Sequence, residues 1–244
     1  IKKKLQVSSN AINNKIEKFV DCEAKFGGEL FITEGDSAKG AIVLARDEEW
    51  QAAYPLRGKM KNLLKHGIEK LLDNEEVRDI ILIMGCGVEV KVKGVNMFDL
   101  SKCRWKRIIF ATDADPDGAH IFCLGITFMY ILCPTLLKEG YIHRLMTPLY
   151  EIRDRKTDEM HYAYSEYEKE DILKNLKDYQ ISRVKGLGEA DSKVMEDCIS
   201  MDNPNYIQVT WDDAEAIVKK MEQWMGEDIV SRKEIIAERL YKYI

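Results

Sequence analysis

Short apolar runs alternate with amphipathic stretches along the chain. The runs at 29–33, 107–112 and 141–152 have the length and the apolar content of buried strands. Helices are predicted between and after these strands, where apolar residues recur every three or four positions. Strands that alternate with helices are typical of α/β proteins, so the pattern predicts a parallel sheet flanked by helices.

Four helices are predicted from this spacing. They cover 59–73, the stretch from Asn74 to Gly85, 119–138 and a stretch that ends at Gly226. Asn74 is expected to cap the second helix, and Asp212 or Asp213 the last one, because short polar side chains accept hydrogen bonds from the first free N–H groups. Residues 80–84 alone also fit a strand.

One uncharged stretch, 121–137, is slightly shorter than a membrane-spanning helix. It contains Pro134 and directly follows an acidic loop, so a buried core helix is predicted instead. No secretory signal is expected at residues 1–4, because no apolar run follows them.

Composition narrows the class of protein. The chain has 244 residues, 45% hydrophobic and 32% charged, which indicates a soluble globular protein of one large or two small domains. Its formal net charge of −5 is unlike that of most DNA-binding domains, but phosphate contacts need only a local basic patch. The six cysteines form no zinc-ligand pattern and are expected to be reduced thiols in a cytoplasmic protein.

An acidic loop follows the second predicted strand. Asp113, Asp115 and Asp117 alternate with other residues and precede Gly118. Carboxylates this close raise each other's pKa unless a cation neutralises them. Ligands that are all oxygen favour Mg²⁺, Mn²⁺ or Ca²⁺ over zinc.

Two other kinds of structure share parts of this acidic pattern. An EF-hand needs a bidentate Glu at its twelfth position, where this chain has Leu124, and a helix before the loop, where a strand is predicted. A solvated acidic turn without a ligand remains open.

Glu34 follows the first predicted strand, as Asp113 follows the second. Because ligands collect at the carboxyl ends of parallel strands, neighbouring strands would bring all these carboxylates to one pocket. Arg57 and Lys59 flank Gly58, where the backbone could approach a phosphate; an ordinary solvated helix start fits the same residues.

Six segments in order make the chain resemble the TOPRIM region of type IIA topoisomerases, as found in B-type subunits. The segments are Glu-Gly-Asp-Ser-Ala at 34–38, Pro-Leu-Arg-Gly-Lys at 55–59 with Asn62, Asp-Ala-Asp-Pro-Asp-Gly at 113–118, Thr-Pro-Leu-Tyr at 147–150, Lys-Gly-Leu-Gly-Glu at 185–189 and Arg-Lys-Glu-Ile-Ile at 232–236. The resemblance covers about residues 20–240.

The resemblance implies a role for each matching residue. Glu34, Asp113 and Asp115 would act in catalysis as ligands of Mg²⁺, for which Mn²⁺ or Ca²⁺ can substitute, and Asp117 would help to hold a second metal. The residues expected to contact DNA are Arg57, Lys59, Asn62 and Lys185.

The resemblance also implies partners and domains. The expected protein is cytoplasmic and nucleoid-associated, and it cuts and reseals double-stranded DNA in an A₂B₂ complex whose A-type subunit supplies the nucleophilic tyrosine. ATP would bind in an upstream domain. Residues 1–26 are expected to be the remnant of a transducer, 27–150 the TOPRIM domain and 151–244 a mixed α+β extension. The alternative is another TOPRIM phosphotransfer enzyme, a primase or a nuclease.

Two departures from the family pattern stand near the expected site. Lys39-Gly40 replaces Gly-Gly, and Phe122 occupies a position where a basic residue is frequent. The second change is expected to remove one phosphate contact. None of the expected metal ligands is altered.

Overall fold

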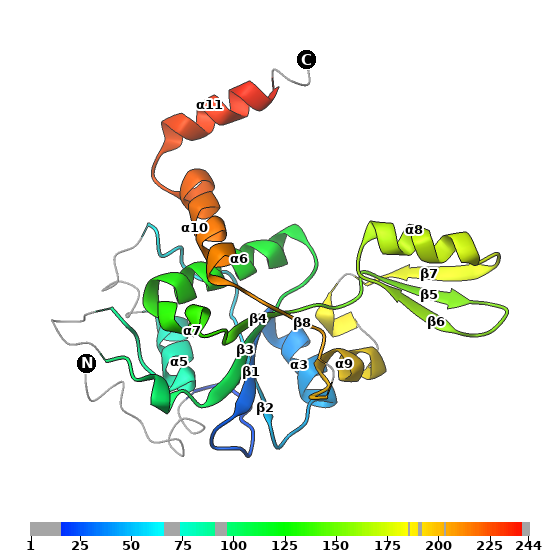
Figure 1. The fold of residues 1–244 in the computed structure, drawn as a ribbon, viewed down its shortest axis with the longest axis horizontal. Coiled ribbons are helices and arrows are strands. Elements are labelled where there is room, and N and C mark those ends of the chain that lie inside the picture. The colour runs from blue at the N-terminus through cyan, green and yellow to red at the C-terminus, as the bar shows by residue number, and fades with distance from the viewer. Residues whose placement is uncertain are drawn as a thin grey trace.

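The computed structural model describes residues 16–65, 74–90, 97–184, 186–189, 192–202 and 204–240. It confirms the α/β prediction, because four of the five strands in the main sheet run parallel (Figure 1). In sheet order the strands are β2 (Gln51–Pro55), β1 (Gly28–Thr33), β3 (Trp105–Ala111), β4 (Ile142–Leu145) and β8 (Tyr206–Gln208). The edge strand β8 runs antiparallel to β4.

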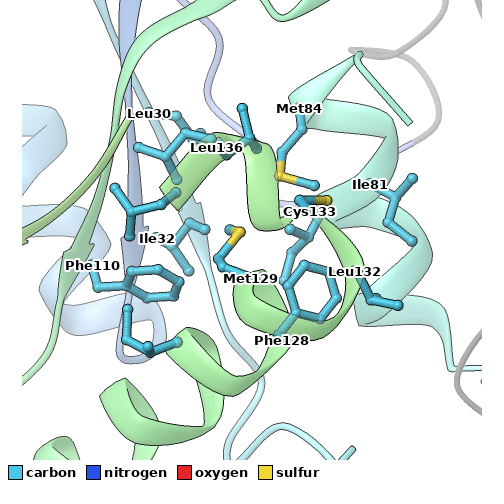
Figure 2. Close-up of a cluster of buried hydrophobic side chains, with 14 of the residues drawn as sticks. Leu30, Ile32, Ile81, Met84, Phe110, Phe128, Met129, Leu132, Cys133 and Leu136 are labelled. Carbon is cyan, nitrogen blue, oxygen red and sulfur yellow. The ribbon is translucent and has the colours of Figure 1, made fainter. Parts of the chain in front are cut away.

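Helices cover both faces of this sheet. On one side lie α3 (Gly35–Ala45) and α9 (Ser192–Ile199); on the other lie α5 (Glu75–Met84), α6 (Pro116–Leu132) and α7 (Pro134–Lys138). Successive side chains of a strand point to opposite faces. Leu30 and Ile32 therefore pack with α5 and α6, as Figure 2 shows, whereas Phe31 packs with α3 and α9.

The C-terminal helices continue this second layer. Helix α10 (Trp211–Met225) packs against α6, and α11 (Ile229–Leu240) projects away from the body (Figure 1). Two short 3₁₀ turns, η1 (Leu100–Lys102) and η2 (Leu187–Glu189), join the larger elements. No helix in the described ranges has the length and apolar content needed to cross a membrane.

A small second sheet stands beside the main one (Figure 1). It contains β6 (Met160–Ala163), β5 (Tyr150–Asp154) and β7 (Tyr179–Arg183), all antiparallel, with α8 (Glu166–Asn175) packed on one face. The chain enters and leaves this sheet at a neck formed by Leu149 and Val184, where the N–H of Val184 donates to the carbonyl of Leu149 at 3.0 Å.

Two predicted elements prove to be divided. The single strand at 141–152 is wrong: β4 and β5 belong to different sheets, and the chain changes sheet around Pro148, which lacks the N–H that a strand ladder needs. The single helix at 119–138 is also wrong. The observed helix α6 begins at Pro116 and ends at Leu132, because Pro134 cannot continue it and instead begins α7.

Helix boundaries agree with the prediction at some ends and differ at others. Asn74 caps α5 by accepting a hydrogen bond from the N–H of Val77 at 3.1 Å, so the helix interpretation of 80–84 is confirmed. Helix α10 is capped by Thr210, and Asp213 completes a capping box by accepting a hydrogen bond from the N–H of Thr210. Residues 59–65 form no helix, and 66–73 lie outside the described ranges, as do residues 1–15.

Close packing between α6 and β3 gives a stability prediction. A methyl group added at Gly125 would overlap the ring of Phe110, whereas one added at Gly40, in helix α3, meets no atom within 4 Å. Gly125→Ala is expected to lower the free energy of unfolding by about 1–3 kcal/mol through overpacking. Gly40→Ala is expected to raise it by about 0.5–1 kcal/mol, because alanine has the higher helix propensity.

Urea unfolding of the two variants and the parent measures both effects. The same substitution in two helices is a matched pair, so equal shifts of the midpoint would contradict the proposed contact between Gly125 and Phe110.

Candidate metal centre

Strand pairing brings the two acidic turns together. The last residues of β1 and β3, Thr33 and Ala111, are paired in parallel register. The N–H of Glu34 donates to the carbonyl of Ala111 at 3.0 Å, and the N–H of Asp113 donates to Oε2 of Glu34 at 3.1 Å. The carboxylate of one turn is therefore bonded to the backbone of the other.

The 186–189 loop packs against the same place. The N–H of Leu187 donates to Oδ1 of Asp113 at 2.9 Å, and a Cβ on Gly186 would lie 3.1 Å from Oδ2 of Asp113. A side chain larger than hydrogen at 186 would crowd this carboxylate. Lys185, an expected DNA contact, lies outside the described residues.

The other two aspartates begin helix α6. Asp115 is its N-cap, and its Oδ1 accepts a hydrogen bond from the N–H of Gly118 at 2.8 Å. Asp117 lies in the first turn and pairs with Lys59, whose Nζ is 2.6 Å from Oδ1. Negative charge is favoured at both positions, since the first turn of a helix presents free N–H groups and the positive end of its dipole.

The carboxylates of this cluster act on one another. Burial raises the pKa of Glu34, and the negative charges of Asp113, Asp115 and Asp117 raise it further, against the lowering effect of the Asp113 N–H. The hydrogen bond and the charge of Lys59 lower the pKa of Asp117. A bound cation would lower the pKa of Glu34 in the same way that Lys59 lowers that of Asp117.

The donor set suits a hard cation. All the candidate ligands are carboxylate oxygens, which Mg²⁺ prefers, and Mg²⁺ keeps several of its waters and needs only one or two carboxylates. Within the described ranges, no three acidic, histidine or cysteine side chains already stand in a metal-binding arrangement. Glu34, Asp113, Asp115 and Asp117 are instead each bonded to a protein N–H or to Lys59.

Of the expected DNA contacts, Lys59 is brought to the acidic loop. Arg57 is not: it pairs with Glu17 at 2.9 Å and with Glu75 at 3.9 Å, beside the start of α5. Asn62 is tied to the end of α10, where its Nδ2 donates to the carbonyl of Met225 at 3.3 Å. The DNA contacts expected for Arg57 and Asn62 remain predictions.

Two further groups at the site were not expected from the sequence. One is the main-chain N–H of Leu187, which no sequence signal reveals. The other is His120, whose pKa is lowered by burial and by the charge of Lys59, while Asp117 opposes the shift. The sequence does indicate that His120 lies near Asp117, because residues three positions apart on a helix are neighbours.

The two departures from the family pattern have local explanations. Lys39 lies 3.7 Å from the carboxylate of Asp36, which also pairs with Lys18. Phe122 is buried, and its ring meets that of Phe110 edge-on with centroids 6.0 Å apart. Phe122 therefore belongs to the core in this chain.

Comparisons with known proteins identify the family that this chain resembles. The sequence-family model of the Toprim domain matches residues 29–145, and that of the DNA gyrase B subunit carboxyl terminus matches residues 176–237. The DNA gyrase B subunit of Archaeoglobus fulgidus is 39% identical over 222 residues, which cover 90% of this chain and 34% of that protein. The corresponding proteins of Thermotoga maritima (39% over 230 residues; 92% and 35%) and Thermus thermophilus (38% over 226; 91% and 35%) are similar. The chain thus spans about a third of the length of these relatives.

Proposed function

Because this chain belongs to the DNA gyrase B family of type IIA topoisomerases and spans its Toprim and carboxyl-terminal regions, we propose that it binds Mg²⁺ and supports the cutting and resealing of double-stranded DNA. The observation that carries the proposal is the bond between Asp113 and Glu34, which joins acidic turns 79 positions apart. The match to the gyrase carboxyl terminus favours this activity over that of a primase or a nuclease.

Each group at the site receives a role. Glu34, Asp113 and Asp115 hold the metal, and Asp117 helps to hold a second one. When bound, Mg²⁺ stabilises negative charge on the phosphate and on the leaving oxygen. The N–H of Leu187 orients the Asp113 carboxylate through its 2.9 Å hydrogen bond.

The remaining parts of the reaction belong to partners. The nucleophilic tyrosine is on an A-type subunit in an A₂B₂ complex, and ATP binds outside these 244 residues. The proposed contacts with DNA are made by Arg57, Lys59, Asn62 and Lys185, and they form when the DNA binds. We place the protein in the cytoplasm, on chromosomal DNA.

Reconstitution with an A-type subunit tests the proposal. Supercoiled DNA is expected to be linearised in the presence of both subunits and Mg²⁺, and EDTA should prevent this. Cleavage by the chain alone would indicate a nuclease instead, and cleavage in EDTA would reject the role of the metal.

Lys59 gives a more specific prediction. Lys59→Ala is expected to weaken DNA binding and to reduce the slope of log affinity against log salt by about 1. The reason is that binding releases fewer counterions from the DNA when one phosphate contact is missing. Lys102→Ala is the matched control: Lys102 is exposed and precedes β3, at the opposite end of the strand from the acidic loop. Fluorescence anisotropy at several salt concentrations measures both slopes, and equal slopes for Lys59→Ala and the parent would contradict the contact.

A further inference from the structure

Three of the six free cysteines gather at the end of the sheet opposite the acidic site. Cys86 follows helix α5, Cys103 lies two residues before β3, and Cys133 separates α6 from α7. The acidic residue Asp113 lies beyond the other end of β3. This group of thiols is thus separate from the proposed metal centre.

The backbones that hold Cys86 and Cys103 run in direct contact. The N–H of Asp99 donates to the carbonyl of Cys86 at 2.9 Å, and the N–H of Arg104 donates to the carbonyl of Met84 at 3.4 Å. Between these bonds, Gly85 has φ of 80°, and a Cβ there would lie 2.9 Å from the carbonyl oxygen of Lys102. Glycine therefore permits an approach close enough for the two cysteines to meet.

The thiols of Cys86 and Cys103 stand on these bonded segments, where they donate to the carbonyls of Gly87 at 3.9 Å and of Trp105 at 3.7 Å. Interaction between the two thiols raises the pKa of Cys86 and lowers the pKa of Cys103. Cys103 is partly exposed, whereas Cys86 is only 1% exposed. Cys103 is thus the more reachable of the two sulfurs, and its lowered pKa favours formation of the thiolate, the form that reacts with oxidants.

We propose that Cys86 and Cys103 are an oxidisable pair that peroxide converts to a disulfide. The Cys103 thiolate attacks one oxygen of hydrogen peroxide, the O–O bond breaks, and the leaving hydroxide takes up the proton that Cys103 gave up. The sulfur of Cys86 then attacks the Cys103 sulfenic acid, the S–O bond breaks, and a second water leaves with the Cys86 proton. Two thiols and one peroxide thereby give one disulfide and two waters.

Cys133 is a bystander in this reaction. Its thiol donates to the carbonyl of Gly87 at 3.6 Å, and burial raises its pKa, so it stays protonated. Figure 2 shows it within the apolar cluster beside Met84. The three thiols are not arranged as a metal site, since no such group of cysteine, histidine or acidic side chains is found among the described residues.

Peptide mapping of the whole chain after brief peroxide treatment tests the pairing. Trypsin is expected to release residues 79–91 joined to the dipeptide 103–104, lighter by two hydrogen atoms than the sum of the separate peptides. Dithiothreitol should separate them again. The oxidised chain should also unfold at a higher temperature than the reduced one, because the bond closes a loop in the unfolded state.

Substitutions locate the reacting sulfurs. Cys86→Ser should abolish the cross-link and leave Cys103 as a sulfenic acid that dimedone labels, and Cys103→Ser should abolish both products. Cys123→Ser is the matched control, because Cys123 is another partly exposed thiol, in α6 and outside the group, and it should leave the cross-link unchanged. A cross-link through Cys133 or Cys123, or oxidation of Cys103 without a cross-link, would overturn the proposal. Neither result would bear on the metal centre.

Discussion

Asp113→Asn and Glu34→Gln are each expected to lower Mg²⁺-dependent DNA cleavage by roughly 10²–10³-fold. Both changes keep the shape of the side chain and remove its negative charge. A metal at a reacting phosphate contributes several kcal/mol of charge stabilisation, and about 1.4 kcal/mol corresponds to a tenfold change in rate. Asp113 is expected to show the larger loss, because the Leu187 N–H and the Gly186 backbone are arranged around its carboxylate.

Two measurements separate loss of the metal from loss of the fold. Titration with Mn²⁺ by calorimetry should show weaker binding in both variants, independently of any activity. Glu48→Gln is the matched control, because Glu48 is an exposed carboxylate beyond the far end of α3, and it should bind and cleave as the parent does. Parental Mn²⁺ affinity in Asp113→Asn would reject the assignment of this ligand.

Glu29→Ala is expected to lower the free energy of unfolding by about 3–5 kcal/mol, as is usual when one member of a buried ion pair is removed. Glu29 is fully buried on β1, and its carboxylate accepts hydrogen bonds from Arg107, from Nε2 of Gln51 at 2.9 Å and from the hydroxyl of Tyr206 at 3.1 Å. These partners belong to β3, β2 and β8, so one side chain joins four strands. Its loss strands the Arg107 guanidinium, whereas Nε2 of Gln51 and the hydroxyl of Tyr206 each retain a bond to the carbonyl of Ile199.

A double variant distinguishes this mechanism from simple loss of volume. Replacing both Glu29 and Arg107 with leucine removes the uncompensated charge, and a buried pair replaced by apolar residues is often nearly neutral. Urea unfolding should therefore show the double variant to be more stable than Glu29→Leu alone. If the double variant is the less stable of the two, Arg107 is not the group stranded by the loss of Glu29.

The meeting of the acidic turns could be predicted from the sequence, because its causes are local. Each acidic residue directly follows an apolar run, and parallel strands end at the same edge of a sheet. Asn74 as the cap of α5 was predictable for the same reason: a short polar residue stands just before a periodic apolar stretch.

Features that depend on distant segments could not be predicted. Strand β2 has two alanines and a glutamine in five residues, so its apolar signal is weak, and only its burial between β1 and α3 makes it a strand. The ion pair of Arg57 with Glu17 joins residues 40 positions apart, and no local pattern in the sequence indicates it. The burial of Glu29 depends likewise on Tyr206, which is 177 positions distant.

The neck between Leu149 and Val184 is where the chain enters and leaves the small sheet, which also meets the main body through Tyr162 and Tyr164 beside α9. The entering and leaving segments are bonded at 3.0 Å, so their spacing is set at the neck and not at the far turn of the small sheet. Residues can be gained or lost at the exposed turn around Thr157 without altering the register of β4 or the position of the acidic turns. Insertions or deletions at this turn are therefore expected to leave the chemistry of the site unchanged.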